Sequence, residues 1–102
     1  MNVEKLLEGM SLEQKVAQLM QIAYTGVSLE EAKNWAKRGV GSFLHVFGDD
    51  ALELQKIAVE NGNPPLLLGI DAVHGHALNK NATVFPTQLS ILQLSLVCQL
   101  SR

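Results

Sequence analysis

A purely apolar run leads directly into a polar cluster in the second half of the chain. Residues 66–76 read Leu66-Leu67-Leu68-Gly69-Ile70-Asp71-Ala72-Val73-His74-Gly75-His76. The run over residues 66–70 has no polar side chain, which is typical of a parallel strand that is buried on both faces. Residues 41–47 are also short, apolar and aromatic, with glycines nearby. We therefore predict two strands, at residues 41–47 and 66–70.

The segment between these two strands has the pattern of a helix. Residues 51–60 present an apolar face, Asp49 or Asp50 can cap the start, and the turn-forming residues 61–65 stop the helix. Strand, helix and strand in this order form a βαβ unit. Such a unit implies a parallel sheet whose functional residues lie beyond the carboxyl ends of the strands.

Two further helices are marked by capping chemistry at their first residues. Ser11 with Gln14 and Ser28 with Glu31 have the spacing of a capping box. The second of these helices ends in a basic turn at Gly39.

The elements fit an α/β fold, but 102 residues are less than half of the ~250 residues of a closed (β/α)8 barrel. A barrel signal in this chain therefore means a fragment.

Composition and charge exclude several classes of partner. The net charge is −2 and the eight Lys and Arg residues are scattered, so we expect no nucleic-acid partner. No apolar run approaches the ~18–20 residues of a membrane span, so we expect no membrane partner. The start of the chain lacks the pattern of a secretory signal, and the lone Cys98 cannot form an internal disulfide. As written, the chain is expected to be cytoplasmic.

The polar cluster after residue 70 allows three interpretations when it is taken by itself. In a structural one, Asp71 caps a turn and His74 and His76 bond to backbone carbonyls. In a second, the two histidines bind a metal, although a catalytic zinc needs about three protein ligands and only His45 and Asp71 remain as candidates. His45 lies within a strand pattern and is expected to be a hydrogen-bonded interior residue. In a third, the Asp71 carboxylate accepts two hydrogen bonds from vicinal hydroxyls of a sugar.

A family resemblance extends through this cluster. Residues 66–76, followed by residues 82–86 (Ala-Thr-Val-Phe-Pro), resemble the amino-terminal barrel of family 3 glycoside hydrolases of the β-glucosidase and exo-glucanase type. Residues 10–19 resemble the first helix of that family, and residues 39–43 resemble its first strand. The resemblance covers residues 8–90.

The resemblance implies a fold and a domain organisation. The fold is α/β and comprises the first two to three βα units of an incomplete (β/α)8 barrel. Residues 1–90 are the expected amino-terminal part of the barrel domain, and residues 91–102 form a divergent tail. The tail is uncharged until its last residue and is compatible with either a strand or a helix.

The resemblance also implies a retaining hydrolase that acts on a β-glucoside or β-glucan oligosaccharide without a cofactor or metal. Asp71 matches the substrate-binding aspartate of the family, with His74 and His76 beside it in the motif. Gly75 is expected to occupy a backbone position with positive φ or close approach.

No catalytic residue is expected within this chain. Retention requires two carboxyl groups ~5–5.5 Å apart, and no Asp or Glu follows Asp71. Asp49 and Glu53 are explained as helix cap and first-turn acid. We therefore expect a truncated segment of a β-glucosidase-like enzyme that is inactive alone. The alternative is a non-catalytic remnant, or an interaction fragment with weak affinity for carbohydrate.

Overall fold

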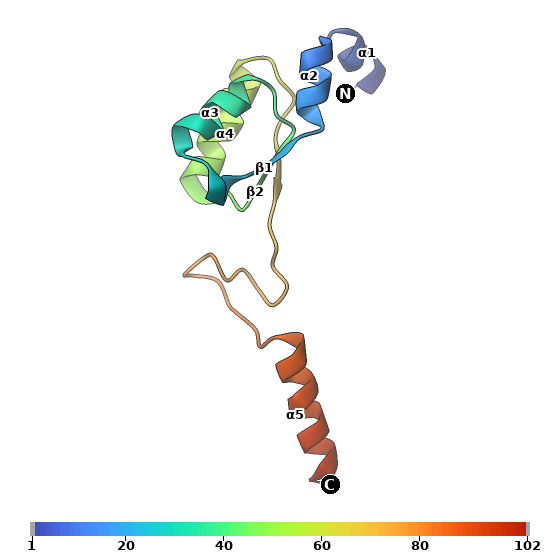
Figure 1. Cartoon of the computed structure of the whole chain (residues 1–102), viewed down its shortest axis with the longest axis vertical. Helices are drawn as coiled ribbons and strands as arrows, with labels where there is room; N and C mark the ends of the chain where they lie inside the picture. The colour runs from blue at the N-terminus through green and yellow to red at the C-terminus, as the bar shows by residue number, and fades with distance from the viewer. Residues whose placement is uncertain (1, 102) are drawn as a thin grey trace. The chain divides into compact units, whose positions relative to one another are not determined.

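The computed structural model describes residues 2–101, which form two compact units that divide after Ile70 (Figure 1). The first unit contains, in order, α1 (Val3–Glu8), α2 (Leu12–Gln18), β1 (Gln21–Ala23), the 3-10 turn η1 (Tyr24–Gly26), α3 (Leu29–Lys37), β2 (Ser42–Leu44), α4 (Gly48–Glu60) and β3 (Leu67–Gly69). The second unit consists of a long loop and α5 (Gln88–Leu100).

The first unit is built on a parallel sheet of three strands in the order β1-β2-β3. Ile22 pairs with Phe43, and Phe43 pairs with Leu68. The helix α3 connects β1 to β2, and α4 connects β2 to β3. The predicted α/β architecture with a parallel sheet is confirmed. Three strands do not by themselves define a barrel.

The strand β1 was not predicted from the sequence. It contains only three residues, and Ile22 is its one large apolar side chain. The segment over residues 39–43, which resembles the first strand of the family, is therefore preceded by another strand in this chain. The predicted strand over residues 41–47 is confirmed at Ser42–Leu44 but ends sooner, because His45 has a φ of +65° and leaves the extended conformation.

The expectation that the strand at residues 66–70 is buried on both faces is wrong. Leu66 is buried, at 5% exposure, but Leu67 is 73% exposed and Leu68 is 44% exposed. Successive side chains of a strand point to opposite faces, so Leu67 lies on the face opposite Leu68. Because β3 is an edge strand of a three-stranded sheet, Leu68 is partly exposed to solvent, even though Phe43, with which it pairs across the strands, is buried.

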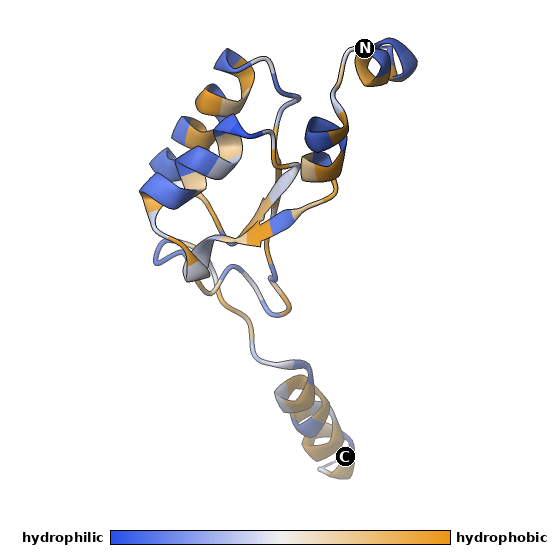
Figure 2. Ribbon diagram, turned by 45° about the horizontal axis from the view of Figure 1, so that its top comes forward, coloured by the Kyte–Doolittle hydropathy of each residue, from blue (hydrophilic) through white to orange (hydrophobic). Residues whose placement is uncertain are grey.

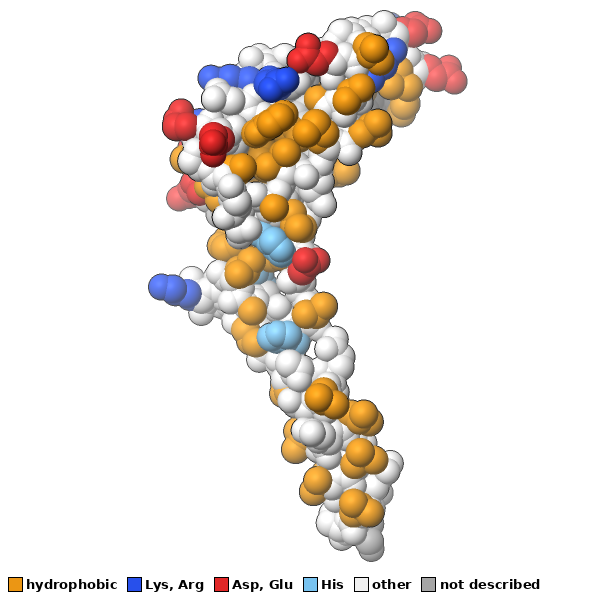
Figure 3. All heavy atoms as spheres, in the orientation of Figure 1, with side chains coloured by type: hydrophobic (Ala, Val, Ile, Leu, Met, Phe, Trp, Pro, Cys, Tyr) orange, Lys and Arg blue, Asp and Glu red, His pale blue; other side chains and the backbone are white. Residues whose placement is uncertain are grey.

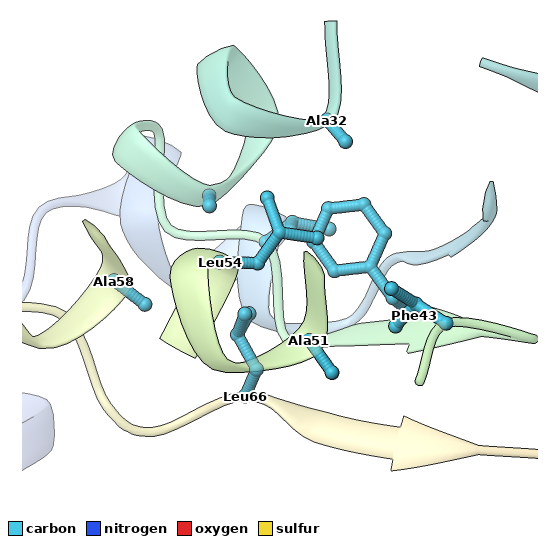
Figure 4. Close-up of a cluster of buried hydrophobic side chains, with 9 residues drawn as sticks. Ala32, Phe43, Ala51, Leu54, Ala58 and Leu66 are labelled. Carbon is cyan, nitrogen blue, oxygen red and sulfur yellow. The ribbon is translucent and has the colours of Figure 1, made fainter. Parts of the chain in front are cut away.

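The core of the first unit lies where α3 and α4 pack together against β2 (Figure 4). Phe43, Leu54 and Val40 are its largest fully buried side chains. Both helices place alanines toward them, and the small side chains let the helices approach closely. The members of this core are Ala32, Ala36, Val40, Phe43, Val46, Ala51, Leu54, Ala58 and Leu66.

The helix ends show which capping predictions hold. The capping boxes at Ser11 and Ser28 are both formed and are confirmed. The predicted cap of α4 by Asp49 or Asp50 is wrong, because this helix already begins at Gly48 and its N-cap is Phe47, which makes no side-chain capping bond. Both aspartates consequently lie in the first turn of α4. Their negative charges there stabilise the helix by interacting with the positive end of its dipole.

In the second unit, residues 91–100 of the tail belong to the helix α5. Of the two conformations that the tail sequence allows, strand and helix, the structure therefore shows a helix. Its N-cap is Thr87, whose hydroxyl accepts a hydrogen bond from the Ser90 backbone at 3.3 Å. None of its described residues is buried, and apolar side chains lie all along it (Figures 2 and 3). Across residues 2–101, no helix has the length and apolar character that a membrane crossing requires. The expected domain boundary after residue 90 stays a prediction.

Candidate functional site

The predicted site residues lie in the loop that follows β3. Asp71 comes two residues after the end of this strand and is exposed, whereas His74 and His76 are half-buried. The loop folds back on itself, because Gly75 forms an antiparallel bridge with Val84. The structure thus places all three predicted residues in one locally ordered loop.

The backbone of Gly75 explains why glycine stands between the two histidines. Its φ is +107°, a conformation that L side chains rarely adopt. A Cβ atom at this position would collide with the carbonyl oxygen of Thr83 and would lie 3.1 Å from Cα of Val84. The predictions of positive φ and of close approach are both confirmed.

His74 is fixed by the opposite segment of the bridge. Its Nδ1 lies 3.0 Å from the carbonyl oxygen of Phe85, and its own carbonyl accepts a 2.6 Å hydrogen bond from the Phe85 backbone. A carbonyl only accepts hydrogen bonds, so Nδ1 carries the proton. In the neutral ring, Nε2 is then the acceptor. For His74, the interpretation of a histidine bonded to a backbone carbonyl is correct, and one ring nitrogen keeps hydrogen-bonding capacity.

Further hydrogen bonds stabilise the loop on either side of His74. The Gln88 side chain, at the start of α5, donates to the carbonyl of Val73 at 3.0 Å. The carbonyl of His76 accepts a 3.0 Å bond from the Asn79 backbone. These bonds hold the backbone of the loop around His74.

The metal interpretation gains no support from the structure. Within residues 2–101, no group of three or more His, Cys, Asp or Glu side chains could hold a metal ion. His45, a candidate third ligand, lies in the other unit, directly after β2. The expectation that His45 lies inside the strand is wrong, because its positive φ ends the strand one residue earlier.

A second polar cluster, in the first unit, was not found from the sequence. The Tyr24 hydroxyl donates a 2.6 Å hydrogen bond to the Asp50 carboxylate. This bond, with burial and the Asp50 charge adding to it, raises the pKa of Tyr24 to about 12. Tyr24 directly follows β1, so the position could be recognised only once that strand was known.

Lys33 extends this cluster across α3 and α4. It lies 2.8 Å from the Glu53 carboxylate and 3.3 Å from that of Glu30, and these contacts raise the pKa of Lys33. Glu53 is therefore held in an ion pair. The expectation that Glu53 is a first-turn acid is wrong, because α4 begins at Gly48 and the acids of its first turn are Asp49 and Asp50.

A cavity of about 350 Å³ lies between α2 and α3 and contains none of the predicted site residues. Arg38 stacks over the Trp35 ring at 4.8 Å and lies 3.4 Å from the Glu13 carboxylate. The remaining lining is apolar. Glu13, which pairs with Arg38 through one oxygen, is therefore the one acidic side chain of an otherwise mostly apolar lining.

No protein-family model matches the chain, and no curated protein sequence matches it. Among solved structures, the chain is similar to two crystal structures of an exo-1,3/1,4-beta-glucanase from a Pseudoalteromonas species. One of the two structures is that of a point mutant. Identity is 31% in both, over 82% of this chain, with TM-scores of 0.65 for the mutant and 0.64 for the other structure. The chain covers only 16% and 12% of those two chains. It therefore shares the fold of a small part of a glucanase, which supports a glycosidase relationship at a coarse level.

Proposed function

We propose that this chain is the amino-terminal part of the barrel of a retaining, β-glucosidase-like hydrolase of glycoside hydrolase family 3. Its contribution is to bind sugar through Asp71, with His74 and His76 in the same loop. The observation that carries the proposal is the similarity to a β-glucanase over 82% of the chain at 31% identity. The position of Asp71 just beyond a parallel strand supports it, because α/β folds bind ligands there.

The chemistry of the loop suits a polyol. The exposed Asp71 carboxylate accepts hydrogen bonds from two neighbouring hydroxyls, and charge assistance makes such bonds stronger than neutral ones. His74 adds a ring nitrogen whose orientation is set by Phe85. The sugar class that we propose is a β-glucoside or β-glucan oligosaccharide, in keeping with the name of the similar exo-1,3/1,4-beta-glucanase.

The hydrolytic step requires a second carboxylate in addition to Asp71. No Asp or Glu follows Asp71, Glu53 is paired with Lys33, and Asp50 is bonded to Tyr24. In our proposal, the nucleophile and the acid/base belong to further parts of a longer protein. A non-catalytic carbohydrate-binding fragment is the second candidate, and it is favoured by the engagement of Asp50 with Tyr24 and of Glu53 with Lys33.

A chimera tests the role of Asp71 in a complete enzyme. This chain replaces the segment that it matches in the Pseudoalteromonas glucanase, and kcat/KM is measured on an aryl β-glucoside. Asp71→Ala removes two charge-assisted hydrogen bonds of about 1.5–3 kcal/mol each, so kcat/KM should fall roughly 10²- to 10⁴-fold. The matched variant Asp49→Ala, an exposed acid of α4, should keep the parental value.

Two outcomes would count against the proposal. If the Asp71→Ala chimera is as active as its parent, Asp71 does not bind the reacting sugar. If the unmodified chain alone hydrolyses the aryl glucoside, and Asp71→Ala abolishes this activity, the reasoning about the missing second carboxylate is wrong.

A further inference from the structure

The cavity between α2 and α3 lies within the first unit and is bordered by apolar side chains that the fold leaves open. Its volume of about 350 Å³ falls within the range of small-molecule sites, about 300–1,000 Å³. Leu12 is 78% exposed and Val16 is 52% exposed, although both belong to the apolar face of α2. Figure 3 shows hydrophobic side chains gathered over this helix. An amphipathic helix buries such a face against a partner, so α2 has apolar surface to offer a ligand.

Backbone hydrogen bonds tie one side of the cavity to the sheet. Met20, which lines the cavity, directly precedes β1, and its carbonyl accepts a 3.2 Å hydrogen bond from the backbone of Ser42, the first residue of β2. Ala17, a second lining residue, is buried, and its carbonyl accepts a 3.0 Å bond from the Gly41 backbone. The cavity is therefore formed by the fold itself and needs no ligand to shape it.

A positive charge of set orientation stands at the rim of this apolar cavity. The Arg38 guanidinium stacks on the Trp35 ring at 4.8 Å, and this contact orients the guanidinium plane. Its Nη2 atom lies 3.4 Å from the Glu13 carboxylate, and the two side chains are 59% and 76% exposed. A long, exposed ion pair of this kind contributes little energy. It engages one nitrogen of a group that has five N–H donors, so Arg38 keeps donors for a ligand.

We propose that this cavity binds an amphipathic monocarboxylate of the medium-chain fatty acid type, with its alkyl chain against α2 and Trp35 and its carboxylate on Arg38. The apolar lining favours burial of the chain. The planar guanidinium fork matches the geometry of a carboxylate. The ligand then competes with Glu13 for Arg38. This inference does not depend on the sugar-binding role proposed for Asp71.

The test uses the fluorescence of Trp35, which is the one tryptophan in the sequence and therefore reports from the cavity itself. The full chain is titrated with octanoate, below its micelle threshold, and with 1-octanol, which has the same chain length and no charge. Octanoate should change the Trp35 emission to saturation. Its Kd should be about tenfold lower than that of 1-octanol, the value of one charge-assisted contact.

Four variants separate the charge from the apolar wall. Arg38→Gln should weaken octanoate binding about tenfold and leave 1-octanol binding unchanged. Glu13→Gln removes the competing carboxylate and should tighten octanoate binding roughly two- to fivefold. Val16→Ser should weaken the binding of both probes. The matched control Leu52→Ser, which removes an exposed apolar side chain of α4, should change neither. Because all four side chains are exposed, each variant should melt like the parent.

Three results would overturn the proposal. Equal Kd values for octanoate and 1-octanol, or an unchanged octanoate Kd in Arg38→Gln, would show that Arg38 binds no carboxylate. Equal losses of binding in Val16→Ser and Leu52→Ser would show adsorption to exposed apolar surface in general. An unaltered Trp35 emission throughout the octanoate titration would show that the cavity takes no such ligand.

Discussion

The hydrogen bond between Tyr24 and Asp50 gives a prediction that tests the packing of the turn after β1 against α4. These residues are 26 positions apart in sequence, and their 2.6 Å bond exists only if η1 and the first turn of α4 meet. Ionising the phenol breaks the bond and places a second negative charge beside Asp50. The Tyr24 pKa of about 12 therefore reports this contact directly.

The size of the effect follows from the rise of the Tyr24 pKa from its ordinary value of 10.0 to about 12. A rise of this size corresponds to about 2.7 kcal/mol in favour of the protonated phenol. Because the pair is partly open to solvent, we expect about 1 kcal/mol of this to appear as folding stability. The folded-state pKa is the higher one, so this contribution is fully present below pH 10 and is lost as the pH rises toward 12.

The assay is a spectrophotometric titration of tyrosinate. Tyr24 is the one tyrosine in the sequence, so the absorbance change belongs to a single group. The parent should titrate near pH 12, and Asp50→Asn, which removes the carboxylate, should titrate close to pH 10. Asp49→Asn is the matched control, because it removes a neighbouring acid and keeps the bond. A parent midpoint near 10, in a chain that circular dichroism shows to be folded, would refute the contact.

Three further predictions concern the core, the loop and the exposed surface. Phe43→Ala should cost about 3–5 kcal/mol, much of the stability of a small domain, and should lower the helical circular dichroism signal as the first unit unfolds; an unchanged signal would show that Phe43 is not central to the core. Gly75→Ala should shift the amide resonances of residues 71–85 while sparing α3 and α4, and an unchanged loop would contradict the collision with Thr83. Large exposed apolar side chains, among them Leu67 and Leu89, should make the isolated chain bind hydrophobic dyes and unfold with little cooperativity; a sharp two-state transition of a monomer would oppose this.

Features encoded within a few residues of sequence could be predicted. The capping boxes at Ser11 and Ser28 depend on side chains three positions apart, and both are formed. The special backbone of Gly75 was also predictable, because glycine between two larger residues in a loop commonly serves a left-handed or crowded position.

Features that depend on distant partners could not be predicted. The exposure of β3 is one of them, because an apolar sequence does not reveal whether a strand lies at the edge of a sheet, where Leu67 stays open. The contact of His74 with Phe85 joins residues 11 positions apart, and the bond from Tyr24 to Asp50 spans 26. Periodicity and capping patterns carry no information over such separations.

The central claim, that Asp71 binds a β-linked glucose oligosaccharide, is tested most directly by titrating the ¹⁵N-labelled chain with laminaritriose. The account predicts chemical-shift changes centred on residues 71–76 that Asp71→Asn removes and Asp49→Asn retains. Equal binding by the Asp71→Asn variant, or no response of the parent chain, would contradict it.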